Sequence, residues 1–66
     1  NLKNMPKPTV NLSEVDGNIF AILGVCTKAL KKEGQINEVK ELTEKVFASS
    51  SYHEALSICL EYVEQQ

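Results

Sequence analysis

Apolar residues recur every three or four positions in three segments of this chain, which is the spacing expected for one face of an α-helix. The segments cover about residues 17–33, 37–48 and 52–64. The connections between them are only a few residues long, and short connections favour antiparallel neighbours. We therefore predict an all-α fold, in which residues 10–66 form a compact three-helix bundle.

The start of the chain lacks this periodicity and contains two prolines. Proline removes a backbone donor, fixes its own φ angle and pushes the preceding residue toward extended geometry. We therefore expect residues 1–9 to form an irregular, extended N-terminal arm. Residues 10–12 alternate as a short strand would, but no other segment suggests a partner strand. We expect this segment to lie over the helices, with Val10 and Leu12 pinned on the core.

Polar residues and a glycine at the edges of the periodic segments predict where the helices begin and end. Ser13 or Asp16 can cap the first helix by accepting hydrogen bonds from free backbone N–H groups. Gly34 is expected to end that helix, because glycine adopts the left-handed conformation without steric penalty. Asn37 is the predicted cap of the second helix. Ser51, with a glutamate three residues later, forms a capping box for the third.

The apolar stripes of the three helices predict the core, and two of them are wider than a surface helix needs. The predicted inward residues are Ile19, Ile22, Leu23, Cys26, Ala29 and Leu30, extended by Phe20 and Val25, on the first helix; Ile36, Val39, Leu42, Val46 and Phe47 on the second; and Tyr52, Ala55, Leu56, Cys59, Tyr62 and Val63 on the third. Ile58 and Leu60 widen the third stripe further. Either the first helix is central in the bundle, or some apolar surface is left for a partner.

A second stripe on the first helix contains small residues at helical spacing. Glycine inside a helix costs up to about 1 kcal/mol relative to alanine, so Gly24 predicts that something approaches the backbone closely. The approaching group is either the chain's own arm or third helix, or a helix of a partner protein. The candidate partner-docking residues on this helix are Gly17, Phe20, Ala21, Gly24, Lys28 and Lys31.

Charge is unevenly distributed along the chain, although the formal net charge is only −2. Residues 1–32 contain five lysines and two acidic residues, whereas residues 33–66 contain two lysines and seven glutamates. Such asymmetry can guide partner binding or head-to-tail self-association. The alternative interpretation is a set of solvated helix faces.

Cysteine content and hydropathy place the chain in the cytoplasm. Cys26 and Cys59 lie in apolar helical patterns, and a small secreted domain held by disulfides usually has four or more cysteines. We expect two reduced thiols, with a bridge between the first and third helices as the alternative. No secretory signal is visible, and no apolar run approaches the roughly 18–20 residues that span a bilayer.

The sequence indicates no catalytic, cofactor or metal site and no small-molecule ligand. His53 has no nucleophile or orienting partner within reach on a helix, and two cysteines with one histidine lack the spacing of a zinc site. Nucleic-acid binding through Lys28, Lys31 and Lys32 is the alternative function. It is disfavoured because the chain has no arginine and the second helix carries several glutamates.

Three stretches of the sequence resemble one known group of proteins. Residues 15–24, 46–56 and 61–64 are similar to those of short uncharacterised bacterial proteins, many of them encoded near prophage or other mobile-element genes. The resemblance covers about residues 12–64 and carries no established activity, so it assigns no functional residues. It implies a small cytoplasmic accessory protein without an enzyme site.

These observations together predict a non-enzymatic helical protein of a bacterial or mobile-element system. We expect it to act as a protein–protein interaction or self-association module, through excess apolar surface on the first and third helices.

Overall fold

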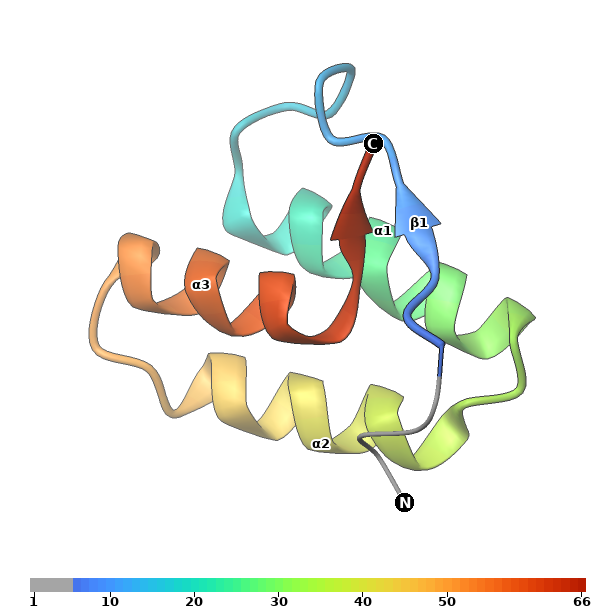
Figure 1. The fold of residues 1–66 in the computed structure, drawn as a ribbon. Coiled ribbons are helices and arrows are strands. Elements are labelled where there is room, and N and C mark those ends of the chain that lie inside the picture. Colours follow the sequence, from blue (N-terminus) through green and yellow to red (C-terminus); the bar gives the residue numbers. More distant parts are fainter. Residues whose placement is uncertain (1–5) are drawn as a thin grey trace.

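The computed structural model describes residues 6–66 and confirms an all-α, three-helix fold. The helices are α1 (Ile19–Lys32), α2 (Ile36–Phe47) and α3 (Tyr52–Tyr62) (Figure 1). They pack pairwise around one core, and the first part of the chain runs across them. Of the predicted arm, residues 1–5 lie outside the described part of the chain.

A small parallel sheet joins the two ends of the described chain, which the sequence did not predict. Strand β1 (Thr9–Val10) pairs with β2 (Glu64–Gln65), and the two lie side by side over α1 (Figure 1). The backbone N–H of Glu64 donates to the carbonyl oxygen of Pro8 at 2.9 Å, and that of Gln66 donates to Val10 at 2.8 Å. The expectation that residues 10–12 have no partner strand was therefore wrong.

The sheet forms because α3 ends earlier than its apolar pattern predicted. Val63 is extended, with φ −136° and ψ 161°, so the helix stops at Tyr62 and does not reach residue 64. This turn buries Val63 and Val10 together in the core, leaving them 2% and 5% exposed. The backbone after Val63 is then free to supply hydrogen bonds to the arm.

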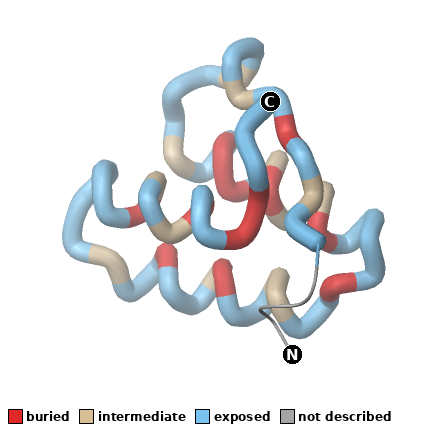
Figure 2. Tube along the Cα trace, in the orientation of Figure 1, coloured by how far each residue is buried: buried red, intermediate tan, exposed pale blue. Residues whose placement is uncertain are grey.

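The core lies between the inward faces of the three helices and beneath the sheet (Figure 2). Cys26 on α1 and Cys59 on α3 are completely buried, and both are free thiols. A hydrogen bond with Cys59 and burial raise the pKa of the Cys26 thiol. The buried residues are Val10, Ile22, Leu23, Cys26, Leu30, Leu42, Val46, Ala55, Cys59, Tyr62 and Val63, with Gln35 as the buried polar residue.

Helix α1 begins two residues later than predicted, because neither Ser13 nor Asp16 is its cap. The side chain of Asn18 accepts a hydrogen bond from the backbone N–H of Phe20 at 2.7 Å. Asp16 instead accepts from the N–H of Asn18 at 3.0 Å and so holds the capping residue in place. At the other end Gly34 has φ +75°, which confirms the left-handed stop.

The start of α2 differs from the prediction, whereas the start of α3 agrees with it. The residue before α2 is Gln35, so the predicted cap Asn37 lies inside the helix. The Gln35 side chain donates a hydrogen bond to the carbonyl oxygen of Pro6 at 2.9 Å, and this bond holds the arm against the start of α2. Ser51 caps α3 by accepting from the N–H of Glu54 at 3.1 Å, and the Glu54 carboxylate accepts from the N–H of Ser50 at 2.6 Å.

A polar cluster joins α2 to α3. The Tyr62 hydroxyl donates to the Glu41 carboxylate, and Lys45 lies 5.3 Å from the centre of the Tyr62 ring. Burial and the bond to Glu41 raise the pKa of Tyr62. None of the helices in the described region has the length and apolar composition needed to cross a membrane.

A candidate protein-docking groove

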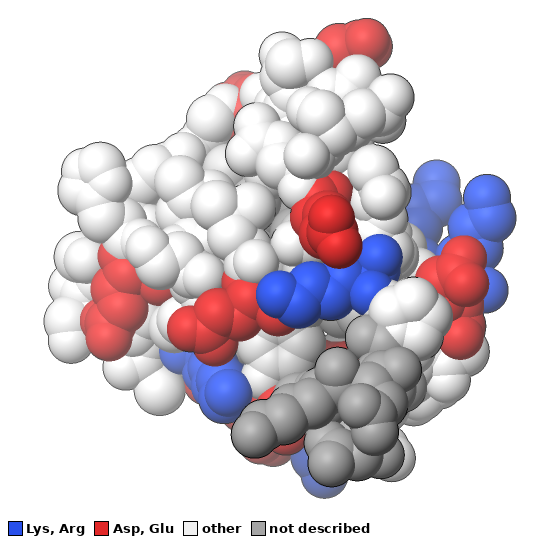
Figure 3. Space-filling model, in the orientation of Figure 1, with Lys and Arg blue, Asp and Glu red and all other residues white. Residues whose placement is uncertain are grey.

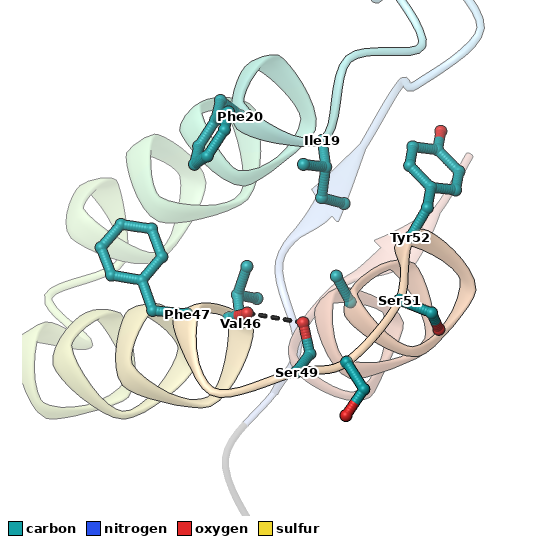
Figure 4. Close-up of a pocket in the computed structure, with 9 residues that line it drawn as sticks. Ile19, Phe20, Val46, Phe47, Ser49, Ser51 and Tyr52 are labelled. Atoms are coloured by element: carbon teal, nitrogen blue, oxygen red, sulfur yellow. Dashed lines mark hydrogen bonds between the residues drawn. The ribbon is translucent and has the colours of Figure 1, made fainter.

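An apolar groove opens at the end of the bundle where α1 begins and α2 passes into α3 (Figure 4). Its volume is about 350 Å³. Its lining, which we call the aromatic groove, consists of Ile19 and Phe20 from α1, Val46 and Phe47 from α2, Ser49, Ser50 and Ser51 from the connection, and Tyr52 and Ala55 from α3.

Two phenylalanines form one side of the aromatic groove. Phe20 is 64% exposed and Phe47 is 67% exposed, and their ring centres lie 6.2 Å apart at an interplanar angle of 63°. This edge-to-face arrangement is a favourable one for aromatic pairs. The pair joins α1 to α2 at the surface while leaving most of both rings open to solvent (Figure 4).

The exposure of these rings corrects the predicted core. Ile36 and Phe47 were expected on the inward face of α2, and Tyr52 on that of α3, but all three are exposed. Leu42 and Val46 alone are fully buried on α2. A bundle of three short helices covers only part of each apolar stripe, so the edges of the stripes remain at the surface.

The opposite side of the aromatic groove is formed by Tyr52, which is 44% exposed. Its ring packs edge-to-face on His53, with centres 5.9 Å apart. A Cβ placed on Gly17 would come within 3.9 Å of the Tyr52 hydroxyl oxygen, so Gly17 lies at the margin of the groove. Val46 and Ala55 are buried and form the floor.

The serine hydroxyls of the connection are largely occupied by local hydrogen bonds. The Ser49 hydroxyl donates to the carbonyl oxygen of Val46 at 2.6 Å (Figure 4). The Ser51 oxygen caps α3, as described above. The lining is consequently dominated by apolar and aromatic groups, which is the composition of a surface that binds apolar side chains.

The six predicted docking residues are distributed along α1 and the segment just before it. Phe20 lines the aromatic groove and Gly17 lies beside it, whereas Ala21, Gly24, Lys28 and Lys31 are exposed further along α1.

Within residues 6–66, nothing packs against the Cβ position of Gly24. A Cβ built on Gly24 would meet nothing within 4 Å, so neither the described part of the arm nor the third helix approaches it, contrary to the first alternative. A partner helix is the second explanation that the sequence offered.

Tyr52 and Phe47 are the groove residues that the sequence reasoning assigned elsewhere. Both belong to apolar helical stripes, and stripe membership alone predicts burial. The sequence feature that could have indicated exposed groove residues was the width of the apolar stripes, because it exceeded what a three-helix core can cover. It indicated surplus apolar surface without indicating which residues supply it.

The titratable side chains of the described region do not assemble into a reactive cluster. His53 is exposed, and no group of three or more His, Cys, Asp or Glu residues within residues 6–66 could hold a metal ion. Basic side chains gather on the side of the molecule where α1 ends, with acidic side chains among them (Figure 3). Lys28, Lys31 and Lys32 are all exposed there.

Comparison of the chain with models of protein families, with curated proteins and with solved structures finds no significant match. The resemblance to short bacterial and prophage-associated proteins therefore stays a prediction.

Proposed function

We propose that this chain is a non-enzymatic protein-interaction module, and that the aromatic groove receives large apolar side chains from a helix of its partner. The observation that carries the proposal is the pair Phe20 and Phe47, which stays mostly exposed beside an apolar hollow of about 350 Å³. Isolated exposed apolar residues are ordinary on protein surfaces, but a clustered apolar patch marks an interaction site.

The dimensions of the aromatic groove favour a side-chain anchor as its occupant. A volume of about 350 Å³ is near the lower limit of the roughly 300–1,000 Å³ of small-molecule pockets, and the groove is open rather than enclosed. Amphipathic helices commonly dock by inserting apolar residues spaced three or four positions apart into such hollows. Exposed aromatic residues around a hollow are the residue type that dominates binding energy at interfaces.

The cellular setting is proposed on the sequence resemblance alone. Similarity to short bacterial and mobile-element proteins supports a cytoplasmic accessory role. In that role, a small chain acts by binding another protein.

Site-specific photocrosslinking tests the proposed function. A photoreactive phenylalanine analogue replaces Phe47 in one variant, Tyr52 in a second, and the exposed α3 residue Leu60 in a matched control. We expect both groove positions to capture the same protein in extract of the source cells, and the control position to capture none of it. When Phe20→Ser is added to the variant with the photoreactive analogue at position 52, that variant should no longer capture the protein. Equal capture at Leu60, or no capture at either groove position, would contradict the proposal.

Nucleic-acid binding is the second candidate, supported by the exposure of Lys28, Lys31 and Lys32 at one end of α1. Phosphate contacts by lysine weaken steeply as salt is raised. This function predicts a DNA or RNA mobility shift at low salt that disappears at high salt and in a variant with all three lysines changed to Gln. No shift at low salt would remove it.

A further inference from the structure

We propose that the unpaired edge of β1 binds an extended peptide that carries acidic side chains. A hollow of about 370 Å³ lies along this edge, and we call it the β1-edge groove. It is lined by Thr9 and Val10 of β1 and by Val25, Lys28, Ala29 and Lys32 of α1. It shares no residue with the aromatic groove, so it is a second interaction surface that takes a different kind of ligand.

Strand β1 has backbone groups that β2 does not use. The carbonyl oxygens of Pro8 and Val10 accept hydrogen bonds from the β2 segment. Peptide groups point alternately to the two sides of a strand, so the N–H and C=O of Thr9 point away from β2. None of the hydrogen bonds found within residues 6–66 uses these two groups. An edge strand with unpaired backbone groups is a template for a further strand, so this edge can pair with a peptide.

The proline next to Thr9 does not block this edge. Pro8 has no N–H, but its backbone faces β2, and the outward donor is that of Thr9. The β1-edge groove contains no residue of β2, so it lies on the unpaired side of β1, over the second half of α1 (Figure 1). A peptide strand paired with Thr9 would therefore cover the groove.

The pairing geometry determines which ligand side chains enter the groove. Antiparallel pairing is the more stable arrangement and lets one ligand residue exchange both hydrogen bonds with Thr9. Opposite side chains in a sheet point to the same face, and Thr9 is exposed whereas Val10 is buried. The ligand residue opposite Thr9 then points to solvent, and the residues on either side of it point toward α1. There the half-buried Val25 and Ala29 supply an apolar surface for one of them.

Two lysines at the rim of the groove select the charge of the ligand. Lys28 and Lys32 are four positions apart, which places them on one face of α1, and both are exposed. The ion pair found within residues 6–66 joins Glu41 to Lys45, so neither rim lysine has an acidic partner in the described part of the chain. Basic side chains gather on this side of the molecule (Figure 3). The rim therefore complements carboxylates that flank an apolar ligand residue at a distance of two positions, because such residues share one face of a strand.

The lining of the groove favours a peptide over a nucleic acid. Proteins hold single-stranded nucleic acid with aromatic side chains on which the bases stack, and the residues that line this groove include none. A backbone edge that offers one donor and one acceptor instead matches another strand. Because β1 is short, we expect weak and salt-dependent binding, with a dissociation constant of about 0.1–1 mM.

A titration followed by nuclear magnetic resonance tests the site on the full chain. The probe is the peptide Glu-Thr-Val-Thr-Glu with blocked termini. We expect saturable shifts of the backbone amides of Thr9 and of residues 25–32 at low salt. The matched control is the same peptide with both threonines N-methylated, which keeps every charge and side chain but removes the donors that pair with Thr9. We expect its affinity to fall at least about fivefold.

Two pairs of lysine substitutions separate the groove from the overall charge of the chain. Lys28→Gln with Lys32→Gln should raise the dissociation constant of the probe at least about fivefold. Lys31→Gln with Lys40→Gln removes the same charge from exposed positions outside the groove and should change it less than about twofold. All four positions are exposed on helices, so both variants should keep the helical circular dichroism spectrum.

Three results would overturn the site: no saturable shift below about 2 mM peptide, equal weakening by the two lysine pairs, or an N-methylated peptide that binds as well as the probe. An oligonucleotide that shifts the same amides when the peptide does not would also overturn it, in favour of nucleic-acid binding. Photocrosslinking at the aromatic groove is independent of all these outcomes, because the two surfaces share no residue.

Discussion

Gly24 and Gly34 occupy backbone conformations with opposite requirements. Gly24 lies inside α1 with open space at its Cβ position. Gly34 lies just after the end of that helix and has φ +75°. Alanine is favoured over glycine in a helix by about 1 kcal/mol, while a left-handed conformation costs a residue with a side chain about 1–2 kcal/mol. The same substitution should therefore have opposite effects at the two positions.

We predict that Gly24→Ala raises the free energy of unfolding by up to about 1 kcal/mol and that Gly34→Ala lowers it by about 1 kcal/mol. Urea denaturation at protein concentrations too low for self-association measures both variants. A loss of stability for Gly24→Ala would show that the backbone there is packed against another part of the chain.

The raised pKa values of Tyr62 and Cys26 predict a pH dependence of stability. In the folded chain the pKa of the Cys26 thiol is raised above its ordinary value of 9.0, because the thiol is hydrogen-bonded with Cys59 and buried. Above about pH 9 Cys26 therefore keeps its proton in the folded chain and lowers the unfolding free energy as pH rises, whereas Cys59, whose pKa is lowered by its hydrogen bond with Cys26, acts in the opposite sense. The stability contributed by Cys26 is fully present below that pH. Tyr62, whose pKa is also raised, adds to the fall above its ordinary value of 10.0.

Urea midpoints at about pH 7 and about pH 10 measure this effect. We expect a lower midpoint at the higher pH and a smaller difference between the two in Tyr62→Phe, even though that variant is less stable throughout. An equal fall in both proteins would assign the pH dependence to other groups.

At the scale of the helices, the caps can be compared directly. Ser51 accepts a hydrogen bond from the N–H of Glu54, whereas Asn37 lies within the first turn of α2 and is exposed. Loss of a side-chain cap costs about 1 kcal/mol, whereas alanine is a better residue than asparagine inside a helix.

We predict that Ser51→Ala lowers the unfolding free energy by about 1 kcal/mol and that Asn37→Ala leaves it unchanged or slightly higher. Thermal unfolding followed by circular dichroism compares the two. A destabilised Asn37→Ala variant would indicate that Asn37 does cap α2, as its sequence context suggested.

The α2 helix shows how far helical periodicity alone reaches. Its spacing correctly placed the helix and identified Leu42 and Val46 as buried. It also predicted burial for Ile36 and Phe47, which are exposed. The pattern records which residues share a stripe, but the neighbouring helices determine how much of the stripe is covered.

At the scale of the whole molecule, the sheet between the two ends of the described chain completes the core. Val10 and Val63 are both buried in the core cluster, and neither belongs to one of the three helices. A chain of this size has only about 3–5 kcal/mol of stability, so closing the core with the strands is a substantial part of the total.

We predict that Val10→Ala lowers the unfolding free energy by about 2 kcal/mol, because it removes buried methyl groups and leaves a cavity. The matched control is Thr9→Ala, which changes an exposed side chain of the same strand and should shift the value by less than about 0.5 kcal/mol. Urea denaturation measures both. Similar small effects would mean that the arm contributes little to the fold.

The candidate site could be only partly foreseen at this scale. The sequence pointed to Phe20 and Gly17, and both lie at the aromatic groove. Tyr52 and Phe47 join them only because the turn between α2 and α3 brings their helix ends beside the start of α1. That proximity depends on packing between segments distant in the chain, which no local spacing encodes.

The amino-acid sequence by itself determined the number of helices, their approximate bounds, the cap at Ser51 and the stop at Gly34. These features depend on residues within about one helical turn of one another, so local spacing and residue type are sufficient. The tertiary structure alone decided the pairing of β1 with β2, the open space around Gly24 and the exposure of Phe47. Each of these depends on how segments far apart in the chain share a limited interior, and a small bundle cannot cover every apolar residue that its helices offer.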